Sequence, residues 1–271
     1  MKYLRNLYRL LRAMIKSPHT LARVISMAPS ICSGYRYSFT NKNTLEKSHP
    51  LIQDNNPLLD YFQNHKHGHG IEKWEHYFEI YHRHFSRFIG KAVGVMEIGV
   101  YSGGSLEMWR SYFGEKSHIY GVDIQEACKV YENDYTKIFI GDQEDRAFWS
   151  TVRAASVEEV DIIIDDGGHT PEQQQVTLEE MLSHLRPGGV YLCEDVHGIF
   201  NRFSGFAIGL ACQLNNFNRI PGPILRSNVS QLQASIHSIH FYPYVVVIEK
   251  HSLTPTELSA PKRGTKWQPF V

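Results

Sequence analysis

The sequence lacks long apolar runs, closely spaced cysteines, and acidic residues in its first 45 positions. No stretch approaches the roughly 18 apolar residues of a spanning helix, and no short apolar segment precedes a small-residue cleavage site. We therefore expect neither a membrane span nor a cleaved signal peptide. The four cysteines lie far apart, which argues against a disulfide framework or a cysteine zinc site. These absences predict a cytoplasmic protein.

The missing acidic residues make the charge distribution uneven. Eight Lys or Arg residues precede Glu46, so the first 45 residues carry +8, and the remainder, with 20 basic and 28 acidic residues, carries −8. Residues 2–16 have helical periodicity, with apolar side chains on one face and cations on the other. The pattern is typical of a helix on an anionic membrane surface, of one that packs on the body or a second subunit, or of a mitochondrial presequence.

The domain organisation follows from changes in periodicity. Residues 28–70 lose the helical pattern and contain several prolines, which predicts a linker that wraps onto the domain. Residues 71–89 again predict a helix, rich in aromatic side chains that suit a core or a substrate wall. The predicted boundaries are a basic amphipathic helix at 1–27, a linker and helical approach segment at 28–89, an α/β domain at 90–252 and a C-terminal tail at 253–271.

Strands and helices alternate strictly after Gly90, which predicts a parallel sheet with helices on both faces. We expect the helix before the last of these strands to end at 187–189, a Pro-Gly-Gly sequence. Two later apolar segments flank a Tyr-Pro-Tyr turn and predict an antiparallel hairpin at the sheet edge. The fold class is thus doubly wound, Rossmann-like α/β with an N-terminal helical extension. The expected strands are 93–100, 118–124, 136–141, 160–165 and 190–196, followed by the hairpin strands 236–241 and 245–250.

The segment that ends in Asp165-Asp166-Gly167-Gly168-His169 gives the first indication of chemistry. Its β-branched residues predict a buried strand that ends in a charged loop, the place where α/β sheets bind ligands. The two glycines allow the backbone to fold back, so that the imidazole approaches the carboxylates. The same glycines also suit a plain helix start, because the residues from Thr170 to Gln173 have capping chemistry.

The loop after the first strand bears on the cofactor. Tyr101 stands two residues after Gly99, where a dinucleotide fingerprint needs glycine. The Glu97 carboxylate would repel a pyrophosphate but attract the ammonium and sulfonium groups of S-adenosylmethionine. Asp123 ends the second strand, where a ribose diol binds, and Asp142 ends the third, within reach of the adenine amine. These residues favour S-adenosylmethionine over NAD.

Five motifs together carry a family resemblance. They are Glu97-x-Gly-x-x-x-Gly-Gly-Ser-x-x-Met-Trp109, Tyr120-Gly-Val-Asp-Ile124, Gly141-Asp-Gln143, Asp165-Asp-Gly-Gly-His169, and Leu185-Arg-Pro-Gly-Gly189 through Glu194-Asp195. With them the chain resembles the metal-dependent class I sugar O-methyltransferases of macrolide and related antibiotic pathways. The same motifs occur in proteins named as cephalosporin hydroxylases, so the resemblance implies the site more narrowly than the reaction.

The resemblance implies a methyltransferase domain at 90–252 that binds S-adenosylmethionine and Mg2+ and methylates a sugar or polyol hydroxyl. It implies Asp166, Glu194 and Asp195 as metal ligands, and carboxylates from neighbouring strand ends also suit a hard divalent ion. We expect His169 to be the general base, with His197 as its rival. The expected cofactor residues are Glu97, Gly99, Gly103, Ser105, Asp123, Asp142, Gln143 and Asp165.

Other interpretations remain open at this point. The acidic residues could cap helices or pair with Arg186 and Arg202, although so many carboxylates would repel one another without a cation. The fold would also serve an oxidoreductase or hydroxylase, or a non-catalytic, membrane-associated nucleotide-binding adaptor. We expect a small-molecule or glycan acceptor and no nucleic acid. Membrane contact through residues 2–16 and a homo-oligomer are further hypotheses.

Overall fold

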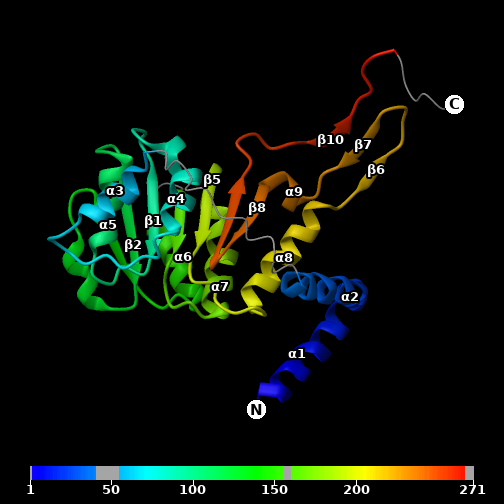
Figure 1. Cartoon of the computed structure of the whole chain (residues 1–271), viewed down its shortest axis with the longest axis horizontal. Coiled ribbons are helices and arrows are strands. Elements are labelled where there is room, and N and C mark those ends of the chain that lie inside the picture. The colour runs from blue at the N-terminus through cyan, green and yellow to red at the C-terminus, as the bar shows by residue number, and fades with distance from the viewer. Residues whose placement is uncertain (1, 41–54, 156–159, 266–271) are drawn as a thin grey trace. The chain divides into compact units, whose positions relative to one another are not determined.

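The structure, a computed structural model, describes residues 2–40, 55–155 and 160–265 (Figure 1). The chain divides into two compact units, Met1–Asp54 and Asn55–Val271. The described part of the first unit consists of helix α1 at Lys2–Lys16 and helix α2 at Pro18–Thr40. Among the described helices, none is both long and apolar enough to cross a membrane.

Helix α1 has the bounds that its periodicity predicts, whereas α2 shows that the linker predicted from residue 28 was wrong over residues 28–40. Pro29 lies inside α2, where a proline removes one backbone donor. Val24, Met27, Ile31 and Tyr35 recur at helical spacing on both sides of it. The helical pattern therefore outweighs one missing hydrogen bond.

The second unit is built on a seven-stranded sheet with the order β3-β2-β1-β4-β5-β9-β8. Strands β1 to β5 pair in parallel, and the hairpin β8–β9 joins β5 in antiparallel pairing. The predicted Rossmann-like fold and edge hairpin are confirmed. The bounds are β1 Gly94–Ile98, β2 His118–Asp123, β3 Thr136–Ile140, β4 Val160–Asp165, β5 Leu185–Cys193, β8 Ile236–Tyr242 and β9 Val245–Lys250.

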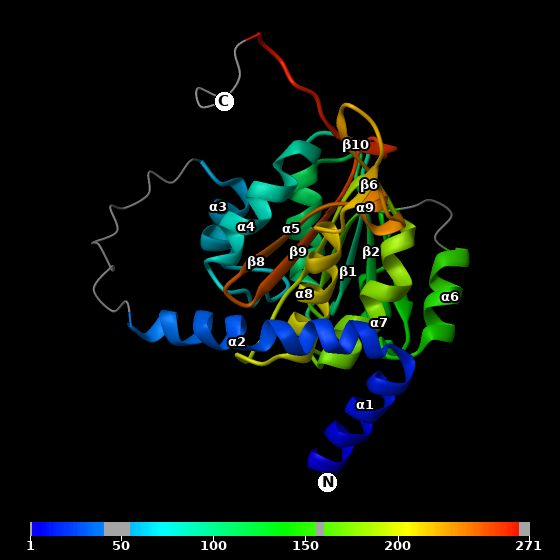
Figure 2. The same ribbon diagram turned by 90° about the vertical axis from the view of Figure 1, so that its right-hand side faces the viewer.

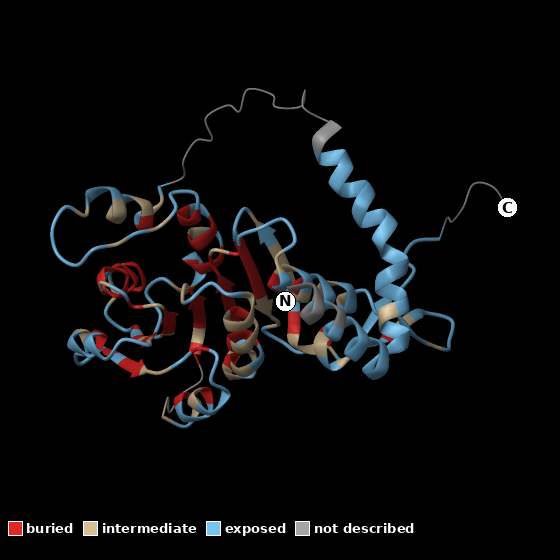
Figure 3. Ribbon diagram, turned by 90° about the horizontal axis from the view of Figure 1, so that it is seen from below, coloured by how far each residue is buried: buried red, intermediate tan, exposed pale blue. Residues whose placement is uncertain are grey.

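Alternating side chains of the strands fill two separate cores. Val95 and Ile162 pack in the core shared with α3, α4 and α5, whereas their neighbours Met96 and Ile163 pack with α6, α7 and α8. Figure 2 shows these helices on the two sides of the sheet, and Figure 3 shows buried residues, in red, in the strands and in the helices beside them. The helices are α3 Pro57–Asn64, α4 Tyr77–Phe85, α5 Gly104–Phe113, α6 Arg146–Ala155, α7 Pro171–Met181 and α8 Arg202–Leu214, with 3-10 helices η1 Ser86–Phe88, η2 Glu126–Tyr131 and η3 Leu182–His184.

Strand β5 begins at Leu185, not at residue 190, so the Pro-Gly-Gly sequence lies inside the strand and does not end a helix. Gly188 has a φ of +79°, and the register of β4 and β5 shifts between Val160 and Ile162. A local irregularity in the pairing thus accommodates the glycines. The strand ends at Cys193, which leaves the two following acidic residues free to change direction.

The helix predicted at 71–89 is shorter than expected. Helix α4 begins at Tyr77, and η1 continues it to Phe88. The backbone before α4 is not helical, because Lys73 and Trp74 direct their polar atoms toward carboxylates at the edge of the sheet. This irregular segment therefore becomes part of the site.

The sequence gives no indication of a second sheet, with the order β10-β7-β6. Strand β10 at Glu257–Ala260 lies within the predicted tail and pairs with β7 at Leu225–Asn228. Strand β6 spans Asn218–Ile220, and the short helix α9 at Gln231–Ser235 leads into β8. These strands are short and mostly exposed, so they lack the apolar alternation that reveals a strand in a sequence.

Candidate active site

A cavity of about 1040 Å3 opens at the carboxyl edge of the parallel strands. Its walls come from the loops after β1 to β4, from the residues just beyond β5, and from residues 72–77. Because ligands of α/β proteins bind beyond the carboxyl ends of the strands, this cavity is the candidate active site.

The loops after β1 and β2 form one side of the cavity. Gly99 has a φ of +89°, and a Cβ atom there would lie 2.0 Å from the backbone oxygen of Asp166, so glycine is required. The Asp123 carboxylate accepts hydrogen bonds through Oδ2 from the backbone N–H groups of Val100, at 2.9 Å, and Tyr101, at 3.0 Å. Gly99 and Asp123, two of the predicted cofactor residues, both line the cavity.

Two more predicted cofactor residues, Asp142 and Gln143, follow β3 and also line the cavity. The Gln143 amide donates to Asp165 Oδ1 at 2.6 Å and accepts from the backbone N–H of Gly168 at 3.0 Å. Asp165 also accepts from the Tyr191 hydroxyl at 2.8 Å, and burial raises the pKa of Asp165 to about 6. Asp165 thus anchors the Gly-Gly loop from below and is not part of the cavity wall.

The remaining three predicted cofactor residues, Glu97, Gly103 and Ser105, do not line this cavity. Glu97 is fully buried and accepts from Ser105 Oγ at 2.6 Å, and burial raises the pKa of Glu97. Gly103 precedes α5 with a φ of +78°, where a Cβ atom would lie 2.8 Å from the ring of Tyr131. These residues shape the glycine loop beneath the cavity.

Three acidic side chains meet where β4 and β5 end side by side. Asp166 follows β4, while Glu194 and Asp195 follow β5. Asp195 has a φ of +53°, so the alternation of the strand is broken and both successive side chains reach the cavity. The predicted metal ligands are therefore brought together.

A lysine from another segment lies among these carboxylates. The Lys73 ammonium donates to Asp166, to Glu194 at 3.2 Å and to Glu97 at 3.4 Å, and the lysine side chain is only 3% exposed. Burial alone would lower the pKa of Lys73, but attraction to the three carboxylates outweighs it and raises that pKa well above its usual range. The site thus contains a cation supplied by the protein.

Sequence reasoning missed this cation. The alternative counterions pair elsewhere, Arg186 with Asp161 at 3.1 Å and Arg202 with Glu172. Lys73 belongs to none of the recognised motifs and precedes Asp166 by 93 positions. Only the charge argument pointed toward it, since clustered carboxylates require a cation of some kind.

The segment around the start of α4 adds hydrogen-bond donors to the same acids. The Tyr81 hydroxyl donates to Glu194 Oε1 at 2.7 Å, and the Tyr77 hydroxyl donates to Asp195 Oδ1 at 2.6 Å. The Trp74 indole N–H donates to that Asp195 oxygen at 3.1 Å. Burial raises the pKa of both tyrosines, so their hydroxyls remain protonated donors. The aromatic helix therefore positions the acids in addition to filling the core.

Two histidines face the acids from the cavity side. His169 Nε2 lies 4.0 Å from Asp166 Oδ1 and 3.7 Å from Asp195 Oδ2, and His197 Nε2 lies 3.6 Å from Asp195 Oδ1. Their side chains are 39% and 51% exposed. His169 has a φ of +57°, and Thr170 after it begins α7 with a capping box. The loop is thus a helix start and a cavity wall at once.

The acids and His169 offer a donor set for a cation. Asp166, His169 and Asp195 each place a ligand atom within 4.8 Å of the others. Glu194, the third predicted ligand, is held by Lys73 and by a tyrosine hydroxyl. Carboxylate oxygens with a neighbouring imidazole suit a divalent ion. The residues present therefore fit such an ion, with Lys73 as a competing cation.

Comparison with known proteins gives related sequences. Residues 96–196 match a family model described as a methyltransferase domain. The 8-demethyl-8-alpha-L-rhamnosyl tetracenomycin-C 2'-O-methyltransferase of Streptomyces olivaceus is 30% identical over 203 residues, which cover 68% of this chain and 53% of that relative. The mycinamicin VI 2''-O-methyltransferase of Micromonospora griseorubida is 32% identical over 197 residues, 63% of this chain and 47% of the relative. The chain spans about half the length of these relatives.

A solved structure shows the same relationship. The MycE methyltransferase from the mycinamycin biosynthetic pathway, in complex with Mg, SAH and mycinamycin VI, has 27% sequence identity and a TM-score of 0.58. The match covers 72% of this chain and 53% of that chain. Residues 96–196, which contain both acidic strand ends and His169, are thus similar to the methyltransferase-domain family, and the unit that contains them shares a Rossmann-like fold with the solved methyltransferase.

Proposed function

We propose that the protein is an S-adenosylmethionine-dependent, Mg2+-assisted O-methyltransferase that acts on a hydroxyl of a sugar or polyol. The observation that carries this proposal is one continuous cavity, lined by Asp123 and Asp142 at the cofactor side and by Asp166, His169 and Asp195 at the other. Both relatives are named as O-methyltransferases, one of them of a rhamnosyl compound, and the MycE structure contains Mg and SAH. We propose the same chemistry here.

The cofactor would lie over Gly99, which lines the cavity and whose lack of a side chain lets the β1 loop pack closely against the backbone of Asp166. Asp123 would accept from the ribose diol, and Asp142 from the adenine amine. Gln143 keeps the wall rigid through its bond to buried Asp165. Ser105 and Lys73 already bond the two oxygens of Glu97, so Glu97 would not contact the cofactor. Its carboxylate would attract the positive charges of the cofactor through the loop.

Asp166 and Asp195, with Glu194 as the third ligand, would hold Mg2+. The bound ion would supply Lewis acidity, which makes a nearby hydroxyl more acidic. His169 would then accept the hydroxyl proton at Nε2, the atom that faces both carboxylates. Tyr77 and Trp74 hold Asp195 in place, so the acceptor oxygen and the methyl group would be aligned without movement of the site.

Transfer of tritium from methyl-labelled cofactor to glycosylated small molecules tests the proposal. We expect label in a product from the full chain with Mg2+, and none after EDTA. Calorimetry should show cofactor binding that survives chelation, because the residues on the cofactor side are separate from the acids. The Asp142→Asn variant, which changes only that side, should weaken cofactor binding and leave the Mg2+ requirement unchanged.

The result discriminates among the alternatives. Cofactor binding without transfer to any acceptor in a broad panel would favour the non-catalytic adaptor. Oxidation or hydroxylation of the acceptor without label would favour the oxidoreductase interpretation. Transfer that is equally fast in EDTA would refute the metal assignment.

We also propose that α1 binds an anionic membrane surface. Helix α1 has no acidic residue in its first turn and ends in Lys16. Leu11 and Ile15 are 49% and 83% exposed, and Arg12 is exposed as well. Each cation near an anionic surface contributes about 1 kcal/mol of attraction. Cosedimentation with phosphatidylserine vesicles should fall sharply when Arg12 and Lys16 become glutamine, and not when Lys91 and Lys116 do; equal binding by both variants would refute the anchor.

A further inference from the structure

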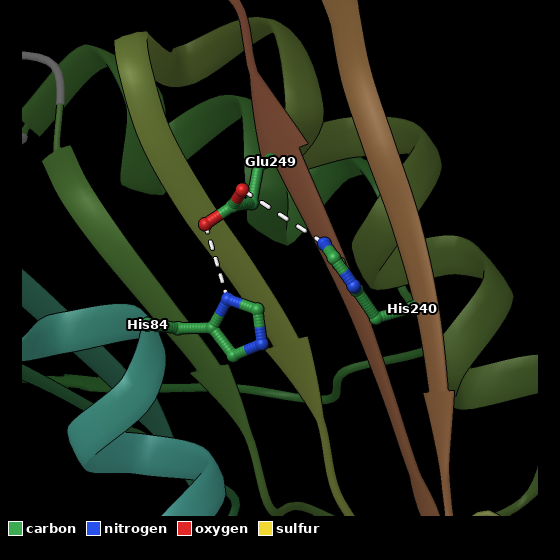
Figure 4. Close-up of side chains that lie close together, drawn as sticks. All are labelled: His84, His240 and Glu249. Carbon is green, nitrogen blue, oxygen red and sulfur yellow. Dashed lines mark hydrogen bonds and ion pairs between the residues drawn. The ribbon is translucent and has the colours of Figure 1, made fainter.

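A second group of metal-ligating side chains lies outside the lining of the cavity. It consists of His84 from α4, His240 from β8 and Glu249 from β9. Figure 4 shows the two imidazole rings directed toward the two oxygens of the Glu249 carboxylate. Elements far apart in the sequence thus bring three donors to one point.

We propose that His84, His240 and Glu249 form a binding site for a zinc-class divalent transition ion. Their ligand atoms lie within 4.8 Å of one another. His84 Nδ1 lies 3.0 Å from Glu249 Oε1, and His240 Nε2 lies 3.9 Å from Glu249 Oε2. Ligands at about 2.0–2.1 Å from a tetrahedral ion stand roughly 3.4 Å apart, between these two values. Two imidazoles and a carboxylate are a known zinc donor set.

Neighbouring hydroxyl groups orient two of the three donors. The Tyr242 hydroxyl lies 2.9 Å from His84 Nε2, so His84 can offer Nδ1 to an ion while its other nitrogen is bonded. Ser238 Oγ donates to Glu249 Oε2 at 3.2 Å, which fixes the carboxylate. Ser238 Oγ also lies 3.0 Å from His240 Nε2, and this contact must open before that nitrogen binds an ion.

Access and competing charge decide whether an ion can enter. His84 is buried, but the His240 side chain is 37% exposed, which leaves an open side for the ion and a water ligand. Arg87 donates to Glu249 Oε1 at 2.9 Å and is the main competitor. Its side chain is 44% exposed, and it also bonds the Gly188 carbonyl, so the guanidinium can leave the carboxylate without being buried unpaired.

An ion here would join α4 to the β8–β9 hairpin. Helix α4 also carries Tyr77 and Tyr81, which bond Asp195 and Glu194. Strand β9 pairs with β5, the strand that precedes these two acids. The proposed site would therefore stabilise the position of the helix over the carboxylates.

The test is a Co2+ titration of the EDTA-stripped full chain, in an Asp166→Asn background that weakens the other donor group. We expect one ion per chain, with the strong visible absorption of a four-coordinate site, and a rise in melting temperature. Adding His240→Ala should weaken binding at least about tenfold and remove the absorption, whereas His240→Cys, which keeps a ligand, should retain both.

His237→Ala is the matched control, because His237 lies on the same strand and contacts His251 edge to face, with ring centroids 4.9 Å apart. We expect no change in this control. Unchanged binding in His240→Ala, or loss only in His237→Ala, would overturn the proposal. A parallel titration of the native chain in excess Mg2+ covers the case in which the Asp166→Asn background does not fold. Methyl transfer is not measured, so the outcome is independent of the proposed enzymatic function.

Discussion

Lys73→Met removes the only positive charge that the structure shows in contact with Glu97, Asp166 and Glu194 in the described part of the chain. The ammonium lies 3.2 Å from Glu194 and 3.4 Å from Glu97. At an effective dielectric of about 20, each of these pairs is worth roughly 5 kcal/mol before the desolvation of the charges is subtracted. Removal of one partner of a buried ion pair costs about 3–5 kcal/mol. We therefore expect Lys73→Met to lower the free energy of unfolding by that amount.

The loss in the free energy of unfolding should depend on pH, and the pKa values of the neighbouring carboxyl groups determine its direction. Burial, and repulsion from Asp166, already raise the pKa of Glu194, and Lys73 opposes this. Without the lysine the pKa values of Glu97 and Glu194 rise further. A carboxyl group whose pKa is higher in the folded than in the unfolded protein makes the folded state less stable as the pH rises toward that folded pKa. The difference in free energy of unfolding between the native protein and the variant should therefore be larger at pH 8 than at pH 5.

Urea unfolding of the full chain at pH 5, 6.5 and 8 measures both effects. Mg2+ should restore part of the loss, by about 2.7 kcal/mol at a concentration of 100 Kd, because a divalent ion replaces the missing charge. Arg83→Met is the matched control: it removes a cation from an exposed pair with Glu79 and should cost less than about 1 kcal/mol. A Lys73→Met variant as stable as this control, with no dependence on pH, would refute the reasoning.

Three further predictions concern the cavity and its supports. His169→Ala should lower turnover by about 100- to 10,000-fold while calorimetry shows unchanged cofactor affinity; full activity would refute the base. Gly99→Ala should abolish cofactor binding and lower the melting temperature, because the new Cβ atom would meet the Asp166 carbonyl. Tyr191→Phe removes a donor that lowers the pKa of buried Asp165. The free energy of unfolding of this variant should therefore fall by about 1–3 kcal/mol at pH 8 and by less at pH 5. An equal drop at both pH values would contradict the ionised state of Asp165.

The sequence predicted the parts of the fold that depend on local pattern. Strand β4 has its predicted bounds, because a β-branched segment is followed directly by acids and glycines that end it. The gathering of the acids at one edge followed from the same logic, since parallel strands end there together, whereas the choice of Asp166, Glu194 and Asp195 as ligands came from the family resemblance. The start of α4 and the second sheet could not be predicted in this way. Contacts distant in sequence decide the first, and the strands of the second carry too few buried residues to form a pattern.

Lys73 shows most clearly what the sequence could not predict. It lies in a segment whose aromatic periodicity favours a helix, and its partners are 24, 93 and 121 positions away. No local signal records such a contact. The need for a cation was evident from the acids alone, but which group supplies it is determined by the folded chain.

Three of the four non-glycine residues with positive φ in the described part of the chain, Tyr101, His169 and Asp195, line the cavity. Each such conformation costs roughly 1–3 kcal/mol. The rest of the domain must hold these residues in place, which lowers its free energy of unfolding. Glycine at these positions would relieve the backbone strain and raise the melting temperature. The same change would remove a ring or a carboxylate from the pocket, so the more stable variant would lose part of the proposed active site.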